Sequence, residues 1–182
     1  MRQDDPPLIS ALVCTCGRGA LVVDTVLSIL ANTHPNFELV VVDQSKDNET
    51  LEALKPFGTD PRLRYVKIAT VGKGNALNAG LTETKGSIIA ITDDDCTVPP
   101  KWLEKFAAIF ATHPKVAVAF CSVEAGEHDP TAGFIPDYVL YGERMLTTMH
   151  DARHVRGLGA GIAVRRDMIE EIGGFDPMLG PG

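Results

Sequence analysis

The chain is organised around the stretch Ile88-Ile89-Ala90-Ile91-Thr92-Asp93-Asp94-Asp95-Cys96. Its first half is a continuous apolar run rich in β-branched residues, which is typical of a strand covered on both faces. Three consecutive carboxylates follow; because packed like charges repel and desolvated carboxylates are costly, packing does not explain them. Open α/β sheets bind ligands at the carboxyl ends of their strands, and hard divalent cations prefer oxygen ligands. The stretch therefore predicts a metal-assisted site for a phosphorylated small molecule.

Strand-like and helix-like segments alternate on both sides of this stretch. Apolar runs bounded by glycine and proline indicate strands over 8–15, 37–42, 63–68, 88–92, 116–121 and 157–164. Apolar residues at helical spacing indicate helices over 20–31, 48–55, 73–85, 101–112, 138–147 and 166–172. Strands that alternate with helices over short connections predict an α/β fold with a mostly parallel central sheet.

Length and charge restrict the class of protein. The 182 residues fit one domain, 1–182, and the net charge of −7 argues against nucleic acid or an anionic membrane as the main partner. No apolar run is long enough to cross a bilayer, and the first seven residues lack the apolar core of a signal peptide. The four cysteines show no metal-ligand spacing, so we expect them to be reduced in a cytoplasmic protein.

Alternation along an extended chain assigns different roles within the aspartate triplet. Asp93 and Asp95 share one face, while Asp94 points to the other. Asp95 lies furthest into the crevice and is our candidate metal ligand. The alternative without a binding function is a solvated acidic turn that caps the next helix.

Other strand ends and loops add candidate ligand groups. Asp43 ends an apolar run and could accept hydrogen bonds from a base or ribose, although aspartate also starts ordinary turns. Arg18, between two glycines, could contact a phosphate or a base. Lys73 opens a predicted helix in a segment that is neither a P-loop nor a Rossmann fingerprint, and a solvated lysine is the alternative. Among the histidines, His154 is expected near the site.

A competing motif also fits the triplet. Asp93, Asp95 and Thr97 match the Asp-x-Asp-x-Thr nucleophile motif of haloacid dehalogenase-like phosphatases, in which the first aspartate attacks phosphorus. That motif normally lies on the first strand, whereas three strand–helix units precede it here. The phosphatase is therefore kept as a minor alternative.

Several blocks in order resemble one known family. They are Ser10-Ala11-Leu12-Val13-Cys14-Thr15-Cys16-Gly17-Arg18, Val41-Val42-Asp43-Gln44-Ser45-Lys46-Asp47, Gly72-Lys73-Gly74-Asn75-Ala76-Leu77-Asn78-Ala79-Gly80, Thr92-Asp93-Asp94-Asp95 with Pro99-Pro100-Lys101-Trp102-Leu103, Gly159-Ala160-Gly161-Ile162-Ala163-Val164-Arg165-Arg166, and Ile172-Gly173-Gly174-Phe175-Asp176. Over nearly its whole length the chain resembles a family 2 glycosyltransferase of the GT-A fold. The resemblance implies a Rossmann-like three-layer α/β/α sandwich, with a nucleotide-sugar-binding half over 1–98 and a partial acceptor half over 99–182.

The resemblance also implies a reaction and its ligands. It implies a nucleotide-sugar donor, with a UDP-sugar favoured, a hydroxyl acceptor, and Mg²⁺ or Mn²⁺ held by Asp95 between the two phosphates. Donor binding falls to Thr15, Arg18, Asp43, Lys73, Asp93 and Asp94. Gly159, Ala160 and Gly161 would border the sugar and the acceptor. The metal would stabilise the charge that develops on the departing nucleoside diphosphate.

The proton acceptor is the part of the pattern that the chain does not match. Family members carry a Glu-Asp pair after the Gly-Gly-Phe-Asp block, and an inverting displacement needs such a general base. We expect this base beyond Gly182, with Asp176 as a weak candidate within the chain. Without a base, the alternative is a nucleotide-sugar-binding module with no catalysis. Family members can also associate with membranes through later segments.

Overall fold

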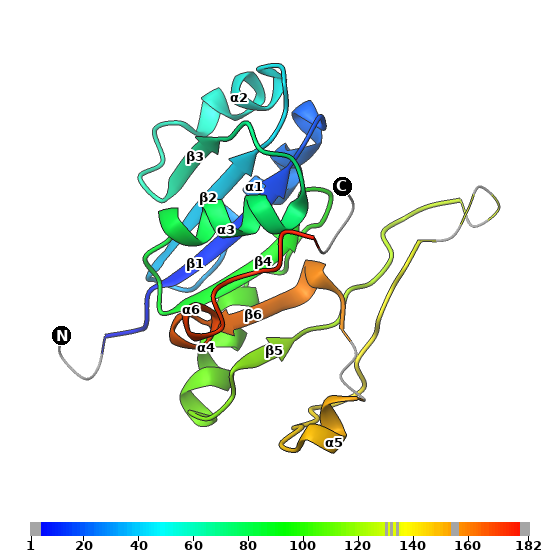
Figure 1. Cartoon of the computed structure of the whole chain (residues 1–182). Helices are drawn as coiled ribbons and strands as arrows, with labels where there is room; N and C mark the ends of the chain where they lie inside the picture. The colour runs from blue at the N-terminus through cyan, green and yellow to red at the C-terminus, as the bar shows by residue number, and fades with distance from the viewer. Residues whose placement is uncertain (1–4, 130, 132, 134, 154–156, 179–182) are drawn as a thin grey trace.

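The computed structural model describes residues 5–129, 131, 133, 135–153 and 157–178. Its sheet has six strands in the order β3-β2-β1-β4-β6-β5 (Figure 1). They are β1 (Ile9–Thr15), β2 (Phe37–Asp43), β3 (Leu63–Lys67), β4 (Ile88–Asp93), β5 (Val118–Phe120) and β6 (Ile162–Arg165). The first four are parallel, whereas β6 runs antiparallel to β4, and β5 runs antiparallel to β6. The predicted mostly parallel α/β sheet is confirmed.

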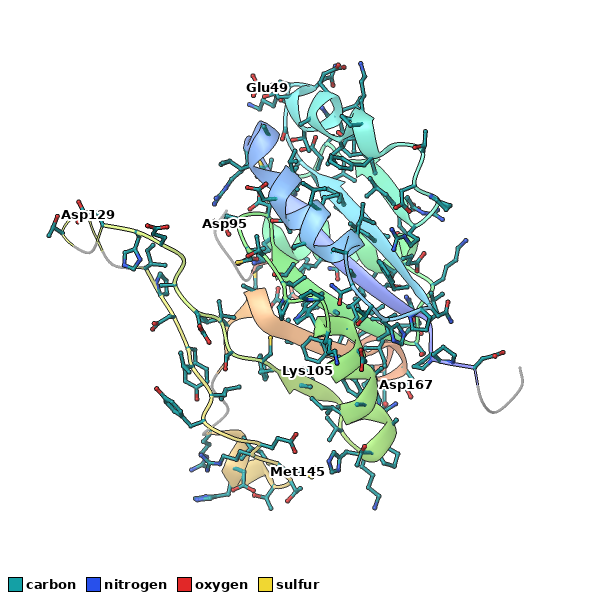
Figure 2. All side chains as sticks on the ribbon, turned by 180° about the vertical axis from the view of Figure 1, so that it is seen from behind. Glu49, Asp95, Lys105, Asp129, Met145 and Asp167 are labelled. Atoms are coloured by element: carbon teal, nitrogen blue, oxygen red, sulfur yellow. The ribbon has the colours of Figure 1, made fainter. Side chains whose placement is uncertain are left out.

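Helices cover both faces of this sheet. They are α1 (Val22–Leu30), α2 (Glu49–Leu54), α3 (Lys73–Glu83), α4 (Trp102–Thr112), α5 (Met149–Ala152) and α6 (Arg166–Glu171), with 3₁₀ turns η1 (Gly19–Leu21), η2 (Lys55–Phe57) and η3 (Gly159–Gly161). Figure 1 shows α3 and α6 in front of the sheet, and Figure 2, from behind, shows α1 and α4 on the opposite face. The predicted three-layer sandwich is therefore also confirmed.

Alternation along the strands supplies a separate core for each face. On β1, Ala11 and Val13 join the cluster under α1 and α4, while Leu12 between them joins the cluster under α3 and α6. Trp102 and Phe106 of α4 are almost completely buried in the first cluster and form an edge-to-face pair 5.5 Å apart between ring centroids. Because β1 is buried on both faces, its sequence is mostly apolar, interrupted only by the buried Ser10 before Thr15 ends the strand.

Two predicted elements in the second half of the chain are wrong. Residues 138–147 contain no helix; Tyr138 forms an antiparallel bridge with Val123, and the Leu140 amide donates to the Ser122 hydroxyl at 2.9 Å. Pairing with a distant segment has overridden the local helical spacing, and the helix here is the four-residue α5. The predicted strand 157–164 begins only at Ile162, because the glycines before it form η3.

The strand order positions the ends of four parallel strands in one row. Register pairs Thr15 with Asp43, Asp43 with Lys67, and Cys14 with Asp93. The chain leaves β1 toward β2 on one side and returns to β4 on its other side, so the loops after β1 and β4 diverge. Such a switch point is where open α/β sheets form their binding crevice.

None of the helices that the structure describes has the length and apolar character needed to cross a membrane.

Candidate functional site

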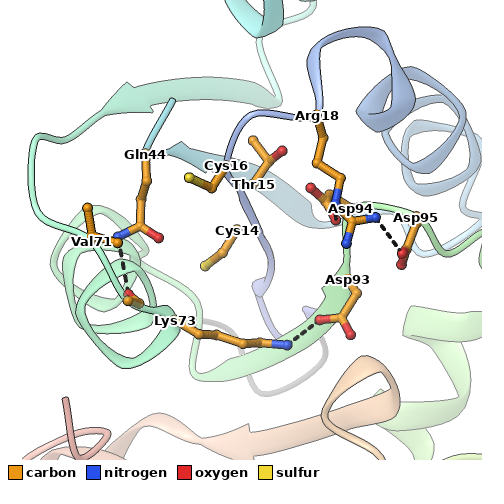
Figure 3. A pocket seen from close by; sticks show the side chains of 11 residues that line it. Cys14, Thr15, Cys16, Arg18, Gln44, Val71, Lys73, Asp93, Asp94 and Asp95 are labelled. Atoms are coloured by element: carbon orange, nitrogen blue, oxygen red, sulfur yellow. Dashed lines mark hydrogen bonds and ion pairs between the residues drawn. The ribbon is translucent and has the colours of Figure 1, made fainter. Parts of the chain in front are cut away.

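A cleft of about 370 Å³ opens at this end of the sheet (Figure 3). Loops after β1, β2 and β4, and the loop between β3 and α3, supply its walls. It is lined by Cys14, Thr15, Cys16, Arg18, Gln44, Val71, Gly72, Lys73, Asp93, Asp94 and Asp95. Of the residues predicted to bind a donor, five line this cleft together with the candidate metal ligand Asp95, and only Asp43 does not.

The three aspartates after β4 are exposed to very different degrees. The side chain of Asp93 is 36% exposed and that of Asp95 51%, whereas that of Asp94 is only 8% exposed. Burial raises the pKa of the Asp94 carboxyl, against the opposing effects of the Thr15 hydroxyl and the Arg18 guanidinium. The backbone carbonyl of Asp94 accepts a 2.9 Å hydrogen bond from the buried Thr25 hydroxyl of α1, which anchors the turn. The turn thus presents two open carboxylates and one buried carboxylate.

Arg18 lies across the cleft mouth from this turn. Its Nη1 donates to Asp95 Oδ2 at 2.8 Å, and its Nε lies 3.7 Å from Asp94 Oδ1 (Figure 3). The turn that carries Arg18 is held by the Gly17 amide, which donates to the Ser45 hydroxyl at 2.8 Å. A cation from the β1 loop therefore already neutralises part of the triplet.

Lys73 supplies a second cation from the opposite wall. Its Nζ pairs with Asp93 Oδ1, and the backbone before it is set by Gly72, whose φ of +109° only glycine adopts without strain. The Gln44 amide nitrogen donates to the carbonyls of Thr70 and Gly72, the latter at 3.1 Å. These bonds tie the β3–α3 loop to the end of β2 and direct Lys73 into the cleft.

Asp43 lies beside the cleft, and its side chain points into the protein interior and not into the cleft. Its side chain is fully buried; Oδ1 accepts from the Ser45 amide at 2.7 Å, and Oδ2 accepts from the Tyr65 hydroxyl at 2.6 Å. Lys67 Nζ lies 4.0 Å from the same Oδ2. Gln44, which the sequence analysis did not select, lines the cleft instead. Neighbouring residues of an extended chain point to opposite sides, and this was the signal that could have found Gln44.

The strand β1 brings thiols as well as Thr15 to the floor of the cleft. Thr15 is 3% exposed and Cys14 is partly buried, whereas Cys16 is exposed. Burial raises the pKa of the Cys14 thiol to about 12, so this sulfur stays protonated near neutral pH. The floor is therefore uncharged between the two ion pairs.

The glycine-rich turn η3 borders the Lys73 side of the cleft. A Cβ built on Gly159 would lie 3.9 Å from Lys73 Nζ, and a Cβ on Gly161 would lie 2.8 Å from Cys121 Sγ. Ala160 between them is partly buried. The predicted acceptor-side residues thus lie next to the predicted donor-side lysine.

Asp176 also lies on the Lys73 side of the cleft, because hydrogen bonds hold the chain after α6 against α3. Asn78 of α3 makes two hydrogen bonds to the backbone of Phe175, at 2.7 and 2.8 Å. A Cβ on Gly74 would lie 2.5 Å from the Asp176 carbonyl oxygen, so only glycine allows this approach. The Asp176 carboxylate accepts from the Met178 amide at 2.9 Å. His154 lies outside the described residues.

The oxygen atoms that the cleft offers suit a metal ion that is coordinated partly by the protein and partly by a bound ligand. Within the described part of the chain, no group of three or more His, Cys, Asp or Glu side chains could hold an ion by itself. Asp95 offers an exposed carboxylate at the edge of a cleft large enough for a diphosphate. Mg²⁺ commonly binds through one or two carboxylates together with water and substrate phosphates. The residues present fit that mode of binding.

Solved structures with the same fold are glycosyltransferases of the GT-A class. The mannosyltransferase PcManGT from Pyrobaculum calidifontis, in complex with GDP-Man and Mn²⁺, superposes with a TM-score of 0.72 at 24% identity, over 97% of this chain and 50% of that one. S. aureus TarS 1-349 gives a TM-score of 0.79 at 20% identity, over 96% of this chain and 52% of that one. These likenesses establish the class of fold.

The sequence model of "Glycosyl transferase family 2" matches residues 10–173, and the chain belongs to this family. The glucosyl-dolichyl phosphate glucuronosyltransferase of Haloferax volcanii is 28% identical over 180 residues, covering 94% of this chain and 57% of that protein. The β-monoglucosyldiacylglycerol synthase of Trichormus variabilis is 27% identical over 184 residues, covering 96% of this chain and 39% of that protein. The chain thus spans about half the length of such relatives or less. Membership of this family favours the transferase over the phosphatase alternative.

Proposed function

We propose that this chain binds a nucleotide-sugar and transfers its sugar to an acceptor hydroxyl, with a nucleoside diphosphate as leaving group. The observation that carries the proposal is the cleft at the switch point, where two exposed carboxylates, Asp95 and Asp93, each pair with a cationic side chain, Arg18 and Lys73 respectively. A diphosphate needs that combination of a metal ligand and positive charge. Every residue that lines the cleft falls within 1–98, the predicted donor half.

Each wall of the cleft has a proposed role. Asp95 would hold Mg²⁺ or Mn²⁺, which when bound supplies a positive charge to the departing diphosphate. Arg18 and Lys73 would contact the phosphates, because guanidinium and ammonium groups form charge-assisted hydrogen bonds to phosphate oxygens. Asp93, next to Lys73, would meet the ribose or the sugar, and buried Asp94 would orient Arg18.

The nucleobase of the nucleotide-sugar would bind near the end of β2. Gln44 Nε2 is engaged by backbone carbonyls, which leaves the amide oxygen as an acceptor for a base N–H. Asp43 was predicted to bond the nucleobase itself; because both of its oxygens are already bonded within the protein, its proposed role is instead to fix the turn through Ser45, while Thr15 lies on the adjacent strand end. A UDP-sugar is favoured; the structural neighbours carry GDP-Man in one case and UDP-GlcNAc in another.

The acceptor would approach from the side of η3 and Asp176. Gly159 is exposed and leaves room there, next to Lys73, whereas Gly161 at the other end of this turn, after Ala160, packs against Cys121. Attack opposite the leaving diphosphate would invert the anomeric carbon. The acceptor proton must then pass to a carboxylate on that side.

Calorimetric titration with UDP, GDP and dTDP, each with Mn²⁺ and with EDTA, tests the proposal. We expect one nucleotide to bind at least about tenfold more tightly with Mn²⁺, a difference of about 1.4 kcal/mol in binding free energy. If no nucleotide binds in a metal-dependent way, the donor-site assignment is wrong. Nucleotide binding without any sugar transfer would instead support the binding-module alternative.

A further inference from the structure

We propose that Arg18 is an internal counter-cation: it holds Asp95 while the donor is absent and passes to the diphosphate when the donor binds. The inference rests on the proposed function, because it concerns how this chain's own residues meet a metal-bound diphosphate. Its consequence is that the free protein binds a divalent cation weakly, and that cation and nucleotide binding are coupled through one side chain.

The contact that suggests this role is directed at the candidate metal ligand itself. Arg18 Nη1 donates to Asp95 Oδ2 at 2.8 Å, and Nε lies 3.7 Å from Asp94 Oδ1, so the guanidinium spans two members of the triplet. The two partners come from different loops, after β1 and after β4, which diverge at the switch point. The ion pair therefore joins these two loops at one side of the cleft (Figure 3).

The ion pair between Arg18 and Asp95 is weak enough for Arg18 to change partners. The Arg18 and Asp95 side chains are 45% and 51% exposed, and ion pairs with that exposure contribute little net free energy because water solvates both partners. Arg18 also lines the cleft, so its guanidinium stays within the site after it leaves Asp95. The turn below it is anchored by Gly17 and Ser45 and does not have to move.

Charge repulsion makes the exchange necessary. A guanidinium and a divalent cation that share one carboxylate repel each other strongly at such separations. A diphosphate removes the conflict, because it offers the guanidinium oxygens that it can bind in a bidentate manner. Lys73 does not compete in this way, since it pairs with Asp93 and not with Asp95. Among the cleft-lining residues that the structure describes, Arg18 is thus the cation that links the metal to the nucleotide, and linkage requires the effect to be reciprocal.

The test measures Mn²⁺ binding in the absence of nucleotide, from the electron paramagnetic resonance signal of free Mn²⁺. Wild type is compared with Arg18→Gln, which removes the charge and keeps a polar side chain. Arg64→Gln is the matched control, because Arg64 is 44% exposed and pairs with a 40% exposed carboxylate, Glu83, at 3.5 Å outside the cleft. Thermal unfolding of all three proteins checks that they are folded.

We expect Arg18→Gln to bind Mn²⁺ at least about fivefold more tightly than wild type, the lower end of usual coupling strengths. Arg64→Gln should bind Mn²⁺ as wild type does. When the nucleotide that binds wild type is added, Mn²⁺ affinity should increase more in wild type than in Arg18→Gln.

Two failures are distinguishable. If wild type binds a nucleotide with Mn²⁺ but Arg18→Gln gains no Mn²⁺ affinity, from a measurable or an undetectable starting level, the counter-cation role is overturned and the proposed function stands. If wild type binds no nucleotide under any condition, the proposed function is wrong, and the inference about Arg18 that rests on it is overturned as well. A gain in Arg64→Gln equal to that in Arg18→Gln would also overturn the inference, because net charge alone would then explain it.

Discussion

Two parallel strands of one sheet end in aspartate, and the two ends are built for opposite purposes. At the end of β2, Asp43 is fully buried and accepts hydrogen bonds from Ser45 and Tyr65. Two residues beyond the end of β4, Asp95 is half exposed; an arginine from another loop donates to one of its oxygens, and the Cys96 thiol lies 3.7 Å from the other. A carboxylate with its bonds satisfied inside the protein stabilises the edge of the cleft, whereas one left open is available to a ligand.

The difference lies in the neighbours and not in the residue type. β3 lies beside β2 and contributes Tyr65 and Lys67, so a donor and a cation lie next to Asp43. Beyond β4 lies the antiparallel β6, whose pairing with β4 stops at Ile91. The chain after β4 is therefore free to turn outward into the cleft.

The largest effect should come from removing the buried carboxylate. Asp43→Ala leaves the Tyr65 hydroxyl and the Ser45 amide without their partner, and we expect a loss of about 2–4 kcal/mol in the free energy of unfolding. Asp95→Ala should cost less than about 1 kcal/mol, because its ion pair is exposed. Urea denaturation followed by circular dichroism measures both. Equal losses in the two variants would remove the distinction between the strand ends.

Nucleotide binding, in contrast to stability, should depend on the exposed carboxylate of Asp95. In wild type, nucleotide affinity with Mn²⁺ should exceed that in EDTA by at least about tenfold. In Asp95→Ala the two affinities should coincide, because the proposed metal ligand is gone. Glu83→Ala, which removes a carboxylate of similar exposure on α3, serves as the control and should keep the dependence. A dependence that persists in Asp95→Ala would move the metal role to another member of the triplet.

The first half of the sheet could be predicted from the sequence because local signals and tertiary packing agree there. The strands β1, β2 and β4 are mostly apolar and buried, β3 packs its partly buried apolar residues against the two core clusters, and each connecting helix carries apolar residues at helical spacing. Beyond α4 this agreement fails. Residues 138–147 have helical spacing but pair with the chain near Val123, and nothing local announces a partner in the preceding segment.

The site was predictable in position and less so in orientation. Parallel strands end at one edge, and this placed Thr15, Asp43 and Asp93 in a row that the register confirms. Whether such a side chain faces the cleft depends on partners far away in the sequence. Tyr65 lies 22 residues from Asp43, and Arg18 lies 77 residues from Asp95. Their roles toward a donor remain predictions.

The smallest effect tests the buried strand end alone. Tyr65→Phe removes one hydroxyl and keeps the ring, so Asp43 loses one of its donors while Ser45 and Lys67 remain; we expect a loss of about 1 kcal/mol at pH 7. Tyr141→Phe is the matched control, because Tyr141 is 96% exposed, and it should leave stability unchanged.

The pH dependence of stability tests whether the folded protein holds the Tyr65 hydroxyl in its neutral form. Burial, and then the hydrogen bond to Asp43, raises the pKa of the Tyr65 phenol above its ordinary value of about 10. A raised pKa in the folded state means that the stabilisation is complete below the pKa of the unfolded chain and is lost as the pH rises through the folded pKa. The stability gap between wild type and Tyr65→Phe should therefore be constant from pH 6 to 9 and should shrink above about pH 10. A phenol with the same pKa in the folded and unfolded chain would give a gap that is independent of pH, so urea denaturation at a series of pH values decides whether folding holds the Tyr65 hydroxyl neutral.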